Sequence, residues 1–215
     1  RVCSRSGAAG QSVVGLGTAK ALAAEGVRVV VCGRDASRLS AALAEIGNGA
    51  VGFACDVSTA DGGREFVQRA IDMLGSVDIL VANGGGPTAG TFASTPEHEY
   101  LPALERSLLS VVAMCNVAIP PMRERGWGRV LAITSSSVRQ PVPNIILSNT
   151  ARAGVTAYLK TVSREIAADG VTVNTIQPGT HRVRTPPPAH PRPRVPSLFR
   201  GRGRPCPRQP PPCVR

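Results

Sequence analysis

Three polar residues in the segment 128–154 have a spacing that suits chemistry on an oxygen-bearing substrate. Ser135 follows an apolar run, Ser148 lies thirteen residues later, and Arg152 lies four residues beyond Ser148. A serine hydroxyl can hydrogen-bond a carbonyl, and an arginine can bind phosphate or sugar hydroxyls while it stays protonated. Neither group is suited to donate a proton near neutral pH, so the set predicts binding more clearly than proton transfer.

These residues require a buried strand that is joined to a helix by a polar turn. Residues 128–134 form an almost unbroken apolar run, which is typical of a parallel strand covered on both faces. Pro141 and Pro143 disfavour an immediate helix, and residues 144–168 then have the spacing of an amphipathic helix. Ser148 and Arg152 lie one turn apart on that helix, so both can face the serines at 135–137.

Strand and helix patterns alternate along the rest of the 215-residue chain, which is 42% hydrophobic. Strands are expected at residues 27–33, 50–56, 77–82, 128–134 and 171–179, and helices at 15–26, 35–46, 58–74, 96–125 and 144–168. This rhythm predicts βαβ units, and therefore one α/β domain with a doubly wound parallel sheet.

The order and spacing of these motifs resemble the short-chain dehydrogenase/reductase family over residues 15–179. The family signature is a serine at a strand end, a tyrosine thirteen residues on and a lysine four residues after that. Within the family, the sequence resembles the branch related to 3-oxoacyl-acyl-carrier-protein reductases, which includes members with a degenerate catalytic tetrad. The resemblance implies a Rossmann-type fold, an NADP(H) or NAD(H) cofactor, and a small-molecule or acyl-thioester substrate that is reduced at a carbonyl or oxidised at a secondary alcohol.

The family tetrad of Asn, Ser, Tyr and Lys falls on Ser107, Ser135, Ser148 and Arg152. In the family the tyrosine protonates the carbonyl, the lysine lowers the tyrosine pKa and holds the ribose, and the serine hydrogen-bonds the carbonyl. Only the serine is retained here, and loss of a positioned general acid costs on the order of 10²–10⁴ in rate. Two functions therefore stay open: an NADP(H)-dependent oxidoreductase, or a nucleotide-binding protein of the same fold without redox activity.

A glycine motif opens the first expected helix. Gly15, Leu16 and Gly17 match the end of the family's TGxxxGxG, while Gln11 stands at its first glycine and Gly10 at its threonine. Glycines let the main chain approach a pyrophosphate, which a helix N-terminus can bind. The alternative is a turn whose small residues allow close helix packing.

Residues at the ends of the second and third expected strands are the candidates for binding the adenosine part of the cofactor. Arg34 suits a ribose 2′-phosphate and favours NADP(H), with NAD(H) as the alternative, whereas Asp35 is explained as a helix N-cap. Asp56 and Val57 resemble the family segment that binds the adenine, and a plain helix cap is the alternative for Asp56.

Further cofactor contacts are implied at the ends of later strands. Asn83, Gly84 and Gly85 resemble the family's NNAG, and glycines at a strand end indicate a ligand nearby. The resemblance also places Pro178, Gly179 and the ribose-binding Arg152 at the cofactor.

Both ends of the chain depart from the family. Residues 1–14 are too polar for the central strand expected there, and residues 182–215 contain nine arginines, eleven prolines and no acid. We expect a domain over residues 1–181, with 1–14 atypical and the last strand missing, and a disordered tail at 182–215. One hypothesis is out-of-frame translation of GC-rich sequence at both ends; the rival is a basic tail that binds nucleic acid. The first predicts no nucleic-acid partner, and the lost segment makes the family's usual homo-oligomer doubtful.

Charge and cysteine content restrict which partners, metal sites and cellular locations are expected. The net charge of +11 belongs to the chain ends, since residues 15–181 are formally neutral. The six cysteines form no CxxC pair, so no metal is expected, and Cys32 and Cys55 read as small buried thiols. No run of eighteen apolar residues and no signal sequence is evident, which favours the cytoplasm and no membrane partner. Tyr158 is expected to point away from the serines.

Overall fold

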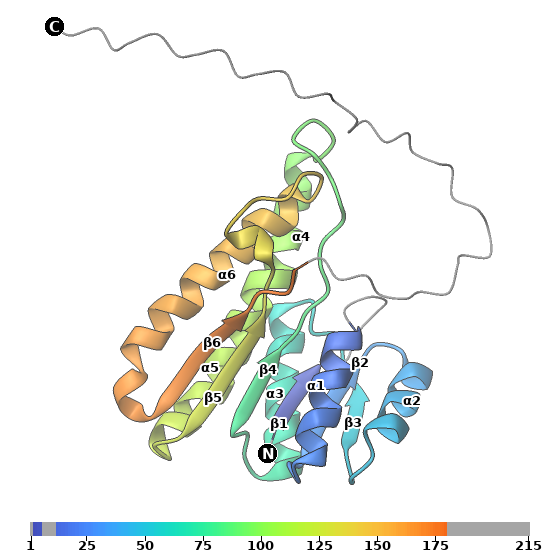
Figure 1. The fold of residues 1–215 in the computed structure, drawn as a ribbon, viewed down its shortest axis with the longest axis vertical. Coiled ribbons are helices and arrows are strands. Elements are labelled where there is room, and N and C mark those ends of the chain that lie inside the picture. Colours follow the sequence, from blue (N-terminus) through green and yellow to red (C-terminus); the bar gives the residue numbers. More distant parts are fainter. Residues whose placement is uncertain (1, 6–11, 180–215) are drawn as a thin grey trace, which may run out of the picture. The chain divides into compact units, whose positions relative to one another are not determined.

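The computed structural model describes residues 2–5 and 12–179. The chain divides into two units, Arg1–His181 and Arg182–Arg215, and the first unit contains the described residues. Their sheet is parallel, with the strand order β3-β2-β1-β4-β5-β6 (Figure 1). The strands are β1 (Val2–Arg5), β2 (Val29–Gly33), β3 (Val51–Ala54), β4 (Ile79–Ala82), β5 (Gly128–Ile133) and β6 (Val171–Ile176).

The helices alternate with these strands, as the sequence predicts. They are α1 (Ser12–Ala24), α2 (Ala36–Ile46), α3 (Ala60–Leu74), α4 (Tyr100–Leu104), α5 (Ser110–Glu124) and α6 (Ile146–Glu165). A π-helical turn, Glu105–Leu109, joins α4 to α5, and single 3₁₀ turns occur at Glu97–Glu99, Ser136–Val138 and Ala167–Asp169. The predicted α/β class and Rossmann-type topology are confirmed.

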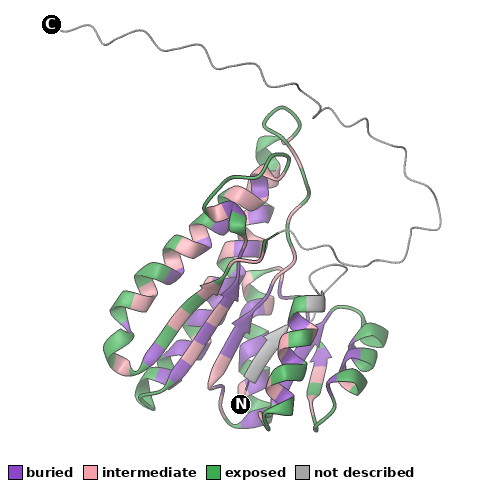
Figure 2. Cartoon of the chain, in the orientation of Figure 1, coloured by how far each residue is buried: buried purple, intermediate pink, exposed green. Residues whose placement is uncertain are grey.

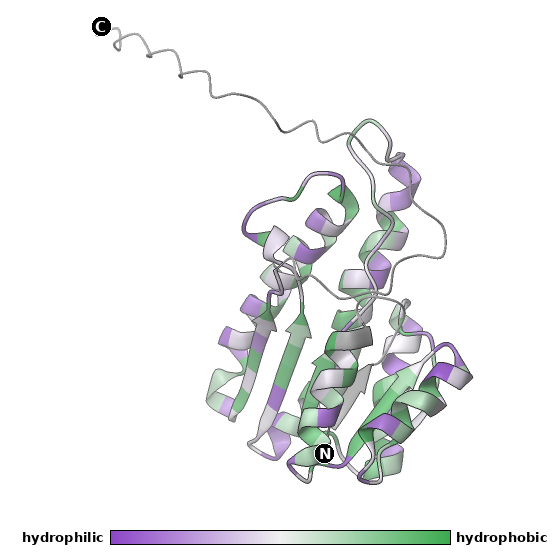
Figure 3. Ribbon diagram, turned by 45° about the vertical axis from the view of Figure 1, so that its right-hand side comes forward, coloured by the Kyte–Doolittle hydropathy of each residue, from purple (hydrophilic) through white to green (hydrophobic). Residues whose placement is uncertain are grey.

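Strand β2 shows why the sheet is covered on both faces. Val29 and Val31 pack with α1 and α2, while Val30 and Cys32 face the opposite cluster, which includes α3, α5 and α6. All five residues of the strand are buried (Figure 2). Complete burial of one such aliphatic side chain stabilises the fold by about 1.5–3 kcal/mol, so a continuous apolar run is what this position requires. Figure 3 shows the same concentration of hydrophobic residues in the strands.

The position of β1 corrects one expectation. The sequence predicts that residues 1–14 are too polar for a central strand, yet Val2–Arg5 lies between β2 and β4 and pairs with both. Its main chain is paired on both sides, and both neighbouring strands are apolar and largely buried. Tertiary context therefore overrides a weak local strand signal.

One face of β6 is left uncovered by the described helices. Val171 and Val173 pack in the cluster with α5 and α6, whereas Thr172, Asn174 and Ile176 alternate with them and are exposed. No further strand follows β6 before the described residues end at Gly179. This agrees with the prediction that the last strand is missing.

The helical stretch Glu97–Glu124 is the one part of the described chain that is long and apolar enough to cross a membrane. Half of its apolar window is buried inside the domain, where α5 packs against α3 and contributes Met114, Ala118 and Met122 to the core. These contacts are those of a core helix.

Candidate active site

The carboxyl ends of β5 and β6 are tied together beside the serine turn. The Thr134 N–H donates to the carbonyl of Ile176 at 2.8 Å, and the Ser136 N–H donates to the carbonyl of Pro178 at 3.2 Å. The structure therefore brings the predicted cofactor segment at Pro178 and Gly179 next to the predicted catalytic turn.

Ser135 caps the 3₁₀ turn that follows β5. Its Oγ accepts a hydrogen bond from the Ser137 N–H at 3.1 Å, and its side chain is half-buried. Because the hydroxyl acts as acceptor in that bond, its own proton stays available for a substrate oxygen. The predicted role of Ser135, to hydrogen-bond a carbonyl, is compatible with this arrangement.

Arg152 is buried on α6, with 4% of its surface exposed. Its guanidinium donates to the carbonyl of Ile133, at the end of β5, at 2.6 Å, and to the carbonyl of Gly84, after β4, at 3.2 Å. The permanent charge is thus balanced by main-chain dipoles at two strand ends. Ser148 lies one helical turn before Arg152 and is half-buried.

Ser107 lies in the π-helical turn and is buried, with 2% exposure. Its Oγ and that of Ser137 find no hydrogen-bond partner within residues 2–5 and 12–179. A buried unpaired hydroxyl costs about 1–3 kcal/mol. Such groups call for an explanation, and a functional role or an ordered water is a common one.

Arg34 and Asp56 meet at the ends of β2 and β3. Their charged atoms are 4.0 Å apart, and both side chains are about half exposed. Asp56 accepts from the Ser58 N–H at 3.0 Å, while the cap of α3 is Thr59, so the helix-cap alternative for Asp56 is wrong. Asp35 does cap α2, and hydrogen bonds from the Arg38 N–H and the Ser37 hydroxyl lower the pKa of its carboxyl.

The glycine motif differs from its expected place. Gly15, Leu16 and Gly17 lie inside the first turns of α1, which begins at Ser12, and the preceding residues 6–11 fall outside the described part. The helix therefore includes both glycines, where a turn before the helix was expected. Val57 is also corrected in part: its side chain is completely buried in the core, so only its main chain can meet a cofactor.

Three of the predicted cofactor glycines face open space. A Cβ added to Gly17, Gly85 or Gly179 would meet no described atom within 4 Å, and none of these glycines has a positive φ. Neither backbone strain nor packing of the described chain therefore explains glycine there. The space beside them is open, which is compatible with a bound nucleotide, and both interpretations of the glycine motif stay predictions.

Tyr158 cannot replace the missing tyrosine. Its hydroxyl interacts with the Cys115 thiol of α5, and its side chain packs against the core cluster. Burial raises the pKa of the Cys115 thiol to about 12 and, together with Cys115, raises the pKa of the Tyr158 hydroxyl. Cys32, Cys55 and Cys115 are buried, as predicted for the first two. His98 is exposed, while His181 and His190 lie outside the described residues.

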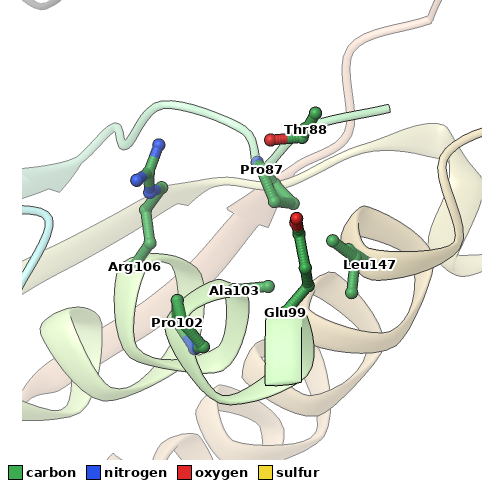
Figure 4. Close-up of a pocket in the computed structure, with 7 residues that line it drawn as sticks. All are labelled: Pro87, Thr88, Glu99, Pro102, Ala103, Arg106 and Leu147. Atoms are coloured by element: carbon green, nitrogen blue, oxygen red, sulfur yellow. The ribbon is translucent and has the colours of Figure 1, made fainter. Parts of the chain in front are cut away.

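A pocket lies between the loop after β4, the α4 region and the start of α6 (Figure 4). It encloses about 280 Å³, part of it open to solvent, and is lined by Pro87, Thr88, Glu99, Pro102, Ala103, Arg106 and Leu147. Arg106 and Leu147 immediately precede Ser107 and Ser148, so the pocket adjoins two tetrad positions. Arg106 was not predicted as a site residue. The sequence does show it as a basic residue in an apolar helix, with no acidic residue three or four positions away.

Comparison with known proteins agrees with this fold. The family model for short chain dehydrogenase matches residues 8–189. The chain belongs to the short-chain dehydrogenase family.

Individual relatives and solved structures share 30% to 33% sequence identity with this chain. A Streptomyces coelicolor protein provisionally named ketoacyl reductase is 33% identical over 78% of this chain, which spans 66% of that protein. A crystal structure of an actinorhodin polyketide ketoreductase variant with NADPH has a TM-score of 0.73 at 33% identity, covering 77% of this chain and 66% of that one. An NADPH-bound short-chain oxidoreductase from Pseudomonas aeruginosa PAO1, described as containing an atypical catalytic center, has a TM-score of 0.72 at 30% identity, covering 81% and 70%.

Proposed function

We propose that the chain is an NADP(H)-dependent oxidoreductase that reduces a carbonyl, of the 3-oxoacyl type in the relatives, or oxidises the matching secondary alcohol. The observation that carries this is Arg152, which ties together the strand ends that bear Ser135 and Gly84, with Ser148 one turn away. The NADPH complexes of two relatives support the choice of cofactor. We propose the cytoplasm as its location.

In this proposal each residue has a limited task. Bound NADPH supplies the hydride. Ser135 orients the carbonyl through its free hydroxyl proton, and Arg34 binds the 2′-phosphate. Arg152 keeps the ribose side of the site positively charged, while Ser107 and Ser148 contribute hydroxyls for a water that delivers the proton.

The second candidate is nucleotide binding without redox activity. It is favoured by Ser148 and Arg152, because a serine hydroxyl is a poor acid and a guanidinium cannot relay a proton.

The deciding experiment follows NADPH consumption with 3-oxoacyl thioesters and small ketones. An oxidoreductase consumes NADPH only when a carbonyl is present, and Ser135→Ala slows it. The double change Ser148→Tyr with Arg152→Lys restores a general acid, so we expect a gain of ~10²-fold, equivalent to about 2.7 kcal/mol of barrier. NADPH binding without turnover in the unmodified chain supports the second candidate. Fast turnover that the double change slows would show that the proton comes from elsewhere.

A further inference from the structure

Arg106 lines the pocket beside the proposed reaction site, and its charge has no acidic partner in the described structure. The ion pairs of residues 12–179 involve other arginines and Lys20. Arg106 is half-buried as a residue, and its guanidinium stands at one side of the pocket in Figure 4. Its charge is therefore available to an anion from outside the described chain.

Neither the neighbouring turns of the helix nor the helix dipole explains a cation at position 106. The residues three and four positions away are Pro102, Ala103, Leu109 and Ser110, none of them acidic. Arg106 also lies in the middle of the helical stretch Glu97–Glu124, where the helix dipole does not stabilise a charge.

Glu99, the other charged residue of the pocket, has a local explanation. It lies in the first turn of the same helical stretch, where a carboxylate is stabilised by the free N–H groups and the dipole. In Figure 4 its carboxylate lies beside Pro87 and Leu147, apart from the guanidinium. Glu99 therefore has a local explanation that Arg106 lacks.

We propose that Arg106 determines substrate specificity by binding the carboxylate of a small oxo acid whose carbonyl reaches Ser135. The proposal rests on the proposed function and narrows its substrate class. The guanidinium fork matches a carboxylate with two parallel hydrogen bonds. The enclosed part of the pocket is small and the rest is open to solvent, which suits a small acid better than a long acyl chain.

The test compares each acid with its neutral methyl ester, in the full chain with NADPH. Pyruvate, 3-oxobutanoate and 4-oxopentanoate place the carboxylate at three distances from the carbonyl. For the preferred acid, Arg106→Met should lower kcat/KM by about 10- to 100-fold, the loss expected for a charged hydrogen-bonded pair, and leave the ester within about threefold. Arg106→Lys should recover part of the loss, since it keeps the charge without the fork.

Two further variants serve as controls. Arg164→Met removes the same charge from an exposed position on α6 and should change neither substrate. As a check from inside the pocket, Glu99→Gln should raise kcat/KM for the acid, because it removes a negative charge from the pocket lining. If Glu99→Gln and Arg106→Met lower kcat/KM for the acid equally, the proposal is wrong, and the pocket binds a substrate that carries both a positive and a negative charge.

A binding measurement keeps the proposal testable if the chain has no turnover. The melting temperature is measured with lactate, 3-hydroxybutanoate and 4-hydroxypentanoate, against their amides and sodium chloride at equal ionic strength. Stabilisation by a hydroxy acid in the unmodified protein, lost in Arg106→Met, supports the anion site even where reduction fails. No stabilisation by any of the three acids, or the same stabilisation in Arg106→Met, overturns it.

Discussion

Arg34 and Asp56 form a pair that a cofactor phosphate can easily replace. Their charged atoms are 4.0 Å apart and about half exposed, and ion pairs of this kind contribute about 0–1 kcal/mol. Little free energy is therefore lost when the Arg34 guanidinium leaves Asp56 and binds a 2′-phosphate. The phosphate also carries more negative charge than a single carboxylate.

A first prediction concerns this residue. NADPH should bind more tightly than NADH, and Arg34→Ala should narrow the difference by ~1.5–3 kcal/mol, the contribution of a charged hydrogen bond. Fluorescence titration with both nucleotides measures this, and Arg164→Ala controls for the loss of charge. Equal affinities for NADPH and NADH in the unmodified protein would contradict the role given to Arg34.

Helix α6 is joined to the sheet edge through Arg152. The guanidinium satisfies carbonyls after β4 and at the end of β5, which lie 68 and 19 residues away in the sequence. A lysine at this position has one charged group on a flexible stem, so it cannot reproduce the fork that spans both carbonyls. The arginine therefore contributes to the geometry of the site as well as to its charge.

A stability measurement tests this. Arg152→Met should lower the free energy of unfolding by about 1–3 kcal/mol, because it removes a charged donor from the carbonyls of Ile133 and Gly84. Arg152→Lys should lose less, and Arg164→Met, on the same helix but exposed, should stay within about 0.5 kcal/mol of the unmodified protein. Urea unfolding at neutral pH gives all three values. If Arg152→Met unfolds at the same urea concentration as the unmodified protein, the link between α6 and the strand ends is unimportant.

At the scale of the whole molecule, the described chain carries the parallel sheet and both faces of its core. The two apolar clusters are built from α1, α2 and the first strands on one side, and from α3, α5, α6 and the sheet on the other. They lie within residues 12–179. The chain spans just under two thirds of the length of several relatives it matches, including the Streptomyces coelicolor protein.

We propose that residues 182–215 add nothing to this core. Their nine arginines and eleven prolines offer no apolar periodicity that could pack. Removal of this segment should leave the melting temperature of the remainder unchanged, and limited proteolysis should cleave it first. A drop of several degrees after truncation, or a segment that resists protease, would reverse this view.

The sequence alone was enough for the alternating elements, since a strand such as Val29–Gly33 or a helix such as Ala60–Leu74 is set by local periodicity. It also predicted the positions of the serine at a strand end and of the hydroxyl and cation that follow it, because their spacing is a local property.

Only the tertiary structure decided which distant groups meet. It placed the polar segment Val2–Arg5 at the centre of the sheet, because pairing with two neighbours outweighs a weak local preference. It joined Arg152 to the carbonyl of Gly84, and it set Arg106 beside Pro87 and Leu147 in one pocket. These contacts join residues far apart in the chain, and local patterns contain no information on them, because burial and hydrogen bonding between such residues are properties of the packed fold.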